Sequence, residues 1–300
     1  MDKGDTMDIQ KFETLLTATD SGTITKAAEN MGYSQSAISH SIQSLEDEFN
    51  IHLLMRGRSG VELTHEGEML LPYIRNVMNS FREFENKVAE INNLECGVIR
   101  IGAFTSIAVN WLPQIINSFK QQHPNIQFEI LHENYAQIVD SILQGTIDCG
   151  FTIAPPTRGI ESILIFEDRL FAIYPNEHPL GSLDTIYPAN LAEYPFILVN
   201  EGKDPIIRRF FEERNIKLDV QYHVVDDYAT IAMVESNLGI SVCPELFFKR
   251  LPFQVQHRPI NTSFRRKINI SYKANYTLSP IVKQFITHAK KWSLDQSTFS

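Results

Sequence analysis

The chain has 300 residues, 43% of them hydrophobic, and a formal net charge of −9. This composition is typical of a globular protein with room for two or three compact units. Its apolar runs fall well short of the roughly 20 residues that cross a bilayer, and the start, MDKGDTMDIQ, is too polar and acidic for a signal peptide. We therefore expect a cytoplasmic protein without a membrane partner.

Three cysteines, Cys96, Cys149 and Cys243, lie far apart and without metal-site spacing. They are typical of structural thiols in a reducing compartment. His65 and Glu66 do not begin a zinc-binding helix, because residue 69 is Met where a second histidine is needed. We expect neither a metal nor another cofactor.

An amphipathic helix is predicted from Ile9 to Thr19, and two further helices between Ser21 and Phe49. The first of these two, about Thr25 to Met31, ends at Gly32, the residue type best able to adopt a positive φ. Ser34 is a strong N-cap for the second, because its hydroxyl accepts a hydrogen bond from an unpaired backbone N–H.

The helix after Ser34 has two faces. Ile38, Ile42 and Leu45 recur at helical spacing and form an inward stripe. The other face carries hydroxyl, amide and imidazole groups that suit phosphates and base edges in a DNA major groove. These are Gln35, Ser36, Ser39, His40 and Gln43. The pattern predicts a helix-turn-helix with this helix as the reader, against the alternative of a helical hairpin with a solvated polar face.

Two short strands, Leu53–Met55 and Val61–Leu63, are predicted around a glycine-flanked turn, as in a wing. Arg58 at the tip is the candidate for a minor-groove or phosphate contact, and Arg56 and Lys26 are candidates for phosphates. The alternative for Arg58 is simple solvation. Residues 1–65 hold five basic and ten acidic residues, so attraction to DNA phosphates should be modest.

Thr64 caps a long predicted helix whose apolar residues recur at three- and four-residue steps. They are Leu70, Tyr73, Ile74, Val77, Phe81, Phe84, Val88 and Ile91. This stripe is too long for the small winged domain to cover, so we expect self-association through a coiled-coil-like contact. Pro72 either kinks the helix or marks its first turn.

A polar hinge is predicted at Asn92–Gly97, and strands and helices alternate beyond it. The predicted strands are residues 98–105, 126–132, 146–153, 170–174, 196–200, 222–227 and 268–272. The predicted helices are residues 106–121, 136–144, 205–214, 228–237 and 279–292. This alternation indicates an α/β fold of parallel sheets with helices on their faces. Asp148, near the start of the third strand, is either structural or a ligand contact.

The segment TKAAENMGYSQSAISHSIQSLEDEF closely resembles the winged helix-turn-helix of the LysR-type transcriptional regulators. LLMRGRSGVELTHEGEMLL resembles their wing and the start of their linker helix. LQGTIDCGFTI resembles the end of their first regulatory subdomain, and LGISVCP a segment of the second, with Asn237 where a glycine is usual. The closely spaced cysteine pair of the family's oxidant sensors is absent.

This resemblance implies an α/β protein with an N-terminal winged helix-turn-helix and a two-lobed effector-binding domain of the type 2 periplasmic-binding-protein kind. The expected parts are a DNA-binding domain at 7–64, a linker and dimerisation helix at 65–92 and a regulatory domain at 97–300. Lobe 1 would comprise about 97–160 and 269–300, and lobe 2 about 161–268. The family usually begins near the position of Met7.

The implied function is a transcriptional regulator rather than an enzyme. Its implied partners are double-stranded promoter DNA, a small-molecule effector, RNA polymerase and further copies of itself in a dimer or tetramer. The expected DNA contacts are Lys26, Ser34, Gln35, Ser36, Ser39, His40, Gln43, Arg56 and Arg58. Two other classes share part of the pattern, a solute-binding protein and an α/β enzyme. The helix-turn-helix argues against the first, and the lack of a phosphate loop or nucleophile elbow against the second.

Family members bind small metabolites, often carboxylates, between the two lobes, beyond the ends of strands. The corresponding residues here are Thr105, Ser106, Thr152, Asn200, Glu201, Gly202, Lys203, Asp226 and Tyr228. The alternative for Thr105 and Ser106 is that they only cap a helix. The acidic residues Glu201, Asp226 and Asp227 would also suit an amine or hydroxyl on the effector.

Overall fold

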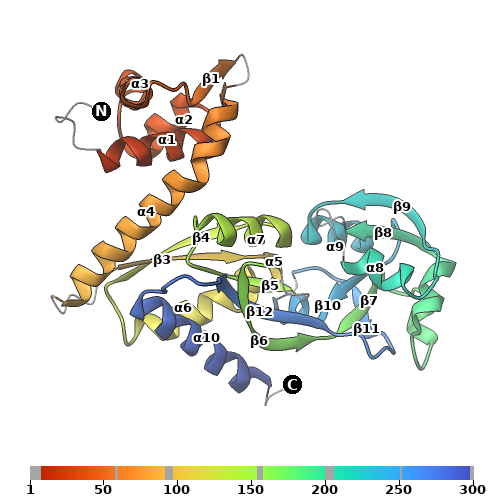
Figure 1. Cartoon of the computed structure of the whole chain (residues 1–300). Helices are drawn as coiled ribbons and strands as arrows, with labels where there is room; N and C mark the ends of the chain where they lie inside the picture. The colour runs from red at the N-terminus through yellow and green to blue at the C-terminus, as the bar shows by residue number, and fades with distance from the viewer. Residues whose placement is uncertain are drawn as a thin grey trace. The chain divides into compact units, whose positions relative to one another are not determined.

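The computed structural model describes residues 8–57, 60–91, 97–153, 158–199, 206–250 and 252–297. The chain divides into two compact units at residues 92 and 93, and Figure 1 shows the elements of each. The predicted hinge residues 92–96, the wing tip at 58–59 and the predicted effector residues 200–203 lie outside the described residues.

Three helices form the start of the N-terminal unit: α1 (Ile9–Ser21), α2 (Ile24–Met31) and α3 (Gln35–Phe49). The left-handed residue Gly32, with φ of 69°, ends α2, and the hydroxyl of Ser34 accepts a hydrogen bond from the backbone N–H of Ala37 at the start of α3. The inward stripe of α3 is buried in a core shared with Phe12 and Leu15 of α1. The predicted helix-turn-helix is therefore present.

The wing consists of strands β1 (Leu54–Gly57) and β2 (Gly60–Leu63), paired antiparallel. Glu46, a buried residue of α3, accepts hydrogen bonds from the backbone N–H groups of Leu53 (2.6 Å) and Leu54 (3.0 Å). Gly60 has φ of +135°, and a Cβ there would lie 2.1 Å from the carbonyl oxygen of Gly22. The wing is thus fixed to α3 by a carboxylate and to the α1–α2 turn by close backbone approach.

Helix α4 (His65–Ile91) continues through Pro72, which therefore does not mark its first turn. Ile74 and Met78 are buried in the core of the N-terminal unit, and Arg75 pairs with Asp20 of α1 at 2.6 Å. Large apolar side chains on α4 are nevertheless exposed: Met69, Tyr73, Val77, Phe84, Val88 and Ile91.

The C-terminal unit begins with a five-stranded sheet in the order β4-β3-β5-β12-β6. Its strands are β3 (Gly97–Ala103), β4 (Ile126–His132), β5 (Cys149–Ile153), β6 (Ile160–Asp168) and β12 (Arg266–Lys273). Strand β3 is parallel to β4 and β5, but β12 is antiparallel to β5 and β6. The sheet is therefore mixed rather than wholly parallel.

Four helices cover this sheet: α5 (Thr105–Asn110), α6 (Leu112–Lys120), α7 (Tyr135–Gln144) and α10 (Pro280–Ser297). Helix α7 lies on one face, and α6 and α10 lie on the other (Figure 1). The prediction of one helix over 106–121 is wrong, because Trp111 (φ −112°, ψ −50°) interrupts it. Pro113, which lacks an N–H, then stands in the first turn of α6, where that donor is not needed.

The remaining strands are β7 (Leu170–Tyr174), β8 (Pro195–Val199), β9 (Asp219–Val224), β10 (Ser241–Pro244) and β11 (Gln256–Pro259). They form an antiparallel sheet β10-β7-β11 and a parallel pair β8-β9. The helical segments are α8 (Ile206–Glu212), α9 (Asp227–Glu235), η1 (Pro179–Ser182), η2 (Pro188–Glu193) and η3 (Glu245–Arg250). These elements enclose their own buried clusters, so we call this part lobe 2 and the five-stranded sheet with its helices lobe 1.

Strands β6 and β12 carry the chain between the lobes, since β7 follows β6 and β12 follows β11. We did not predict β6, which extends the pairing of lobe 1 as far as Asp168. The sheets thus separate at Asp168, whereas the division near residues 160 and 161 expected from the sequence stays a prediction.

Candidate DNA-binding and effector sites

The polar face of α3 is open to solvent along its length. Ser34, Gln35, Ser36, His40 and Gln43 are exposed and Ser39 is half-buried, while the apolar stripe faces the core. Steps of four residues place Gln35, Ser39 and Gln43 on one line along the helix. These neutral donors and acceptors have the reach and variety needed for base edges.

Two of these side chains already have partners within the chain. Ser34 Oγ lies 2.9 Å from Ser36 Oγ, and Gln43 Nε2 donates to Asp47 Oδ1 at 2.9 Å. A base contact by Gln43 would have to replace this bond beside a carboxylate. Lys26 is exposed on α2, Arg56 belongs to β1, and Arg58 lies outside the described residues.

Ser106, predicted to face an effector, is fully buried and bonded to an arginine. Its Oγ accepts a hydrogen bond of 3.0 Å from Arg266 Nη2, and Tyr135 OH accepts one of 3.1 Å from Arg266 Nη1. The Arg266 guanidinium also lies over the Phe104 ring, 5.2 Å from its centroid. Residues at the starts of α5 and α7 therefore converge on one cation.

Asp168 neutralises this cation. Arg266 Nη2 pairs with Asp168 Oδ2, and neither side chain is exposed. Burial raises the pKa of Asp168, and the attraction of Arg266 offsets that rise in part.

Asp168, Arg266 and Tyr135 were not among the residues predicted from the sequence. Each stands at the end or start of an apolar segment, where a charged or polar residue is ordinarily solvated. A signal was nevertheless present, because the charged pairs Asp168-Arg169 and Arg265-Arg266 stand directly beside strand-forming segments.

The other predicted lobe 1 residues also have local partners. Thr105 is half-buried, with Oγ1 3.2 Å from His132 Nε2. Thr152 is buried, and its hydroxyl lies 2.6 Å from that of Ser271. Neither Thr105 nor Ser106 caps α5, whose N-cap position is Phe104. Asp148 is structural, since its carboxylate accepts a hydrogen bond from the backbone N–H of Arg100.

In lobe 2, Asp226 caps α9 by accepting a hydrogen bond from the backbone N–H of Ala229 at 2.7 Å. Tyr228 packs beside Phe247 and Phe253, and burial together with the neighbouring carboxylates raises the pKa of its hydroxyl. Asn200, Glu201, Gly202 and Lys203 lie outside the described residues.

Within the described residues, no group of three or more candidate metal ligands occurs, and no helix is long and apolar enough to cross a membrane. Cys149 and Cys243 are buried in different cores, and burial raises the pKa of the Cys149 thiol well above its usual value.

Two family models match the chain. Residues 9–68 match the bacterial regulatory helix-turn-helix protein, lysR family, and residues 92–293 match the LysR substrate binding domain. YvbU, an uncharacterised HTH-type transcriptional regulator of Bacillus subtilis (strain 168), is 27% identical over 289 residues, which are 95% of this chain and 98% of YvbU.

Solved structures share the fold. Full-length CbnR complexed with its target DNA matches with a TM-score of 0.69 and 20% identity, over 95% of this chain and 99% of that one. The effector binding domain of QuiR in complex with shikimate matches with a TM-score of 0.60 and 23% identity, over 67% of this chain and 98% of that domain. The expected fold class is therefore confirmed.

The buried ion pair predicts an asymmetric mutational response. Arg266→Ala or Asp168→Ala should each destabilise the protein by about 3–5 kcal/mol, because each leaves one charge buried without its partner. The double variant Asp168→Leu, Arg266→Met should lose much less. Urea unfolding measures all three, with Arg169→Ala as a control from a partly exposed pair worth below about 1 kcal/mol. Additive losses in the double variant would contradict this account.

Proposed function

The chain belongs to the LysR family of DNA-binding transcriptional regulators, and we propose that α3 reads promoter DNA under the control of a small molecule bound between the lobes. The DNA-binding assignment rests on the exposed polar face of α3, which lies opposite its buried apolar stripe. Ser34 caps the N-terminus of this helix. Its relatives are regulators rather than enzymes.

The acidic balance of the N-terminal unit limits what one copy can do. Few cations are available for phosphates, so the helix N-terminus and paired reading heads would supply the affinity. A dimer would bind a partly palindromic site with half-sites roughly one helical turn apart. Such a regulator would act in the cytoplasm and contact RNA polymerase.

The exposed stripe of α4 supports self-association. Tyr73 is 69% exposed and Phe84 63% exposed, although both are large apolar side chains. Steps of four, seven, four and three residues connect Tyr73, Val77, Phe84, Val88 and Ile91 along one side of the helix. We assign this stripe to a dimer contact, and a tetramer would need a further contact through the C-terminal units.

For the effector, the half-buried hydroxyl of Thr105 is the most accessible of the predicted lobe 1 contacts. Ser106 and Thr152 are buried and already hydrogen-bonded, so they would support the site without contacting the effector directly. Control requires that the effector binds one arrangement of the heads more tightly than another.

The double variant Gln35→Ala, Ser39→Ala should lose a discrete, dyad-like footprint on captured genomic fragments at physiological salt. Each lost base contact should cost about 1–3 kcal/mol, which is roughly tenfold or more in affinity. Gln122→Ala, an exposed glutamine of the other unit, is the control and should footprint like the wild type. Equal, weak binding by all three proteins at every sequence would refute specific recognition by α3.

Tyr73→Glu and Phe84→Glu should dissociate the dimer, because a carboxylate on the stripe would be desolvated in the contact. Sedimentation equilibrium gives the mass directly. Tyr187→Glu changes a comparably exposed tyrosine elsewhere and should leave the mass unchanged. Dimers that persist in both α4 variants would show that α4 is not the contact.

A thermal-shift panel of small carboxylates and amines tests the effector. A binder should raise the unfolding temperature of the wild type, and Thr105→Val, which removes only a hydroxyl, should reduce that shift. Operator footprints should stay unchanged in this variant. Thr287→Val on α10 is the matched control, and an undiminished shift in Thr105→Val would remove Thr105 from the site.

A further inference from the structure

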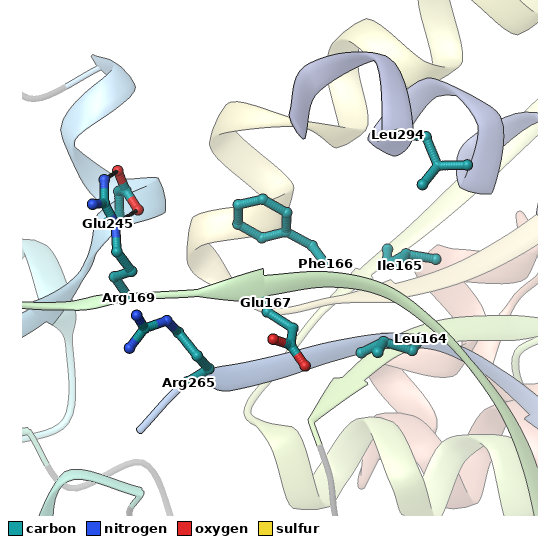
Figure 2. Close-up of a pocket in the computed structure, with 8 residues that line it drawn as sticks. All are labelled: Leu164, Ile165, Phe166, Glu167, Arg169, Glu245, Arg265 and Leu294. Carbon is teal, nitrogen blue, oxygen red and sulfur yellow. Dashed lines mark hydrogen bonds and ion pairs between the residues drawn. The ribbon is translucent and has the colours of Figure 1, made fainter. Parts of the chain in front are cut away.

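A pocket of about 530 Å³ lies beside the segments that connect the lobes, and none of the residues predicted to bind an effector lines it. Figure 2 shows Arg169, Glu245 and Arg265 toward one end, Leu164 and Leu294 toward the other, and Glu167 between them. Its volume is within the range of small-molecule sites. Its lining comes from β6, the residue between β6 and β7, η3, the residue before β12, and α10.

The apolar wall is held in place from behind. The Phe166 ring packs edge-on against buried Trp111, with centroids 4.9 Å apart, and Trp111 packs against Trp292 at 5.4 Å. Ser293 Oγ donates to the carbonyl oxygen of Ile165 at 3.1 Å and so ties α10 to β6. This wall is a rigid surface rather than an adaptable one.

Two leucines of the lining remain open to water. Leu164 on β6 is 46% exposed, and Leu294 on α10 is 57% exposed. Covering both would remove apolar surface from water, which favours a ligand with an apolar body.

At the charged end, one arginine already forms an ion pair within the chain. Arg169 pairs with Glu245 through two contacts, one of them Nε to Oε2 at 2.8 Å. Glu167 lies 3.8 Å from Lys267 on the neighbouring strand. These carboxylates would repel a ligand with two negative charges.

Arg265 differs from Arg169 in its hydrogen-bonding partners. It is half-buried, and its Nη1 donates to the backbone carbonyl oxygens of Thr262 (2.9 Å) and Phe264 (2.8 Å). No carboxylate among the described residues forms an ion pair with it. The backbone thus fixes a guanidinium at the pocket and leaves its charge without a counter-ion, which suits one carboxylate.

We propose that this pocket is a second small-molecule site, for a monocarboxylate with an aromatic or branched apolar body. The carboxylate pairs with Arg265, and the body covers Phe166, Leu164 and Leu294. Arg265 stands where the chain enters β12 from lobe 2, whereas Leu294 belongs to lobe 1, so the ligand contacts the connection between the lobes. It biases their arrangement to the extent that it binds one arrangement more tightly.

The chain provides its own reporter. It has two tryptophans, and both Trp111 and Trp292 belong to the ring cluster behind Phe166. Full-length protein is titrated with 3-phenylpropionate while tryptophan emission is recorded. A saturable change is expected, with much weaker effects from 3-phenylpropan-1-ol, which lacks the charge, and from succinate, which has two charges and no apolar body.

Arg265→Gln should weaken 3-phenylpropionate binding about tenfold or more. The matched control is Lys283→Gln, which removes the same charge from an exposed position of α10 that does not line the pocket. Leu294→Asp, which changes a side chain that is 57% exposed, should also abolish binding. Thr105→Val should leave it unchanged, which separates this pocket from the effector site proposed above.

Three results would overturn the proposal. The first is no saturable change in the wild type up to about 10 mM ligand. The second is equal affinity in the wild type, Arg265→Gln and Leu294→Asp proteins. The third is loss of binding in Thr105→Val with retention in Arg265→Gln, which would place the probe in the other site.

Discussion

The architecture of the C-terminal unit depends on one ion pair at the point where paired strands leave a sheet. Asp168 ends β6, Arg266 begins β12, and the two residues are directly opposite each other in the register. Both charges are fully buried, so they require hydrogen-bonding partners, and Ser106 and Tyr135 accept from the guanidinium. The connection between the lobes is therefore held by polar contacts from two helices as well as by apolar packing.

Strand alternation gives this connection two chemically different sides. Asp168 and Arg266 face inward and are matched, whereas their sequence neighbours Arg169 and Arg265 line a solvent-accessible pocket. A change at the outer side acts on the same backbone segments that position the inner pair. Ligand binding there can affect the arrangement of the lobes directly, because the residues that contact the ligand are part of the connection.

The features predicted correctly from the sequence are those that depend on residues close together in the chain. The glycine after α2, the serine cap of α3 and the spacing of Ile38, Ile42 and Leu45 define the helix-turn-helix without distant contacts. The role of Arg266 could not be predicted in this way, because its partner Asp168 is 98 residues away in the chain. Ser106 was expected at an open site for the same reason, since nothing near it in sequence indicates the arginine that covers it.

The acidic composition of the N-terminal unit makes promoter binding depend on how two copies of the chain are arranged. A single reading head with neutral side chains and few cations would bind DNA weakly, and Gln43 would have to leave Asp47 to reach a base. In the proposed dimer, the second head binds at a high effective concentration, provided that its spacing matches the site. Affinity then depends more on head placement than on either head alone. A modest coupling free energy between ligand and quaternary arrangement would therefore be enough to change promoter occupancy.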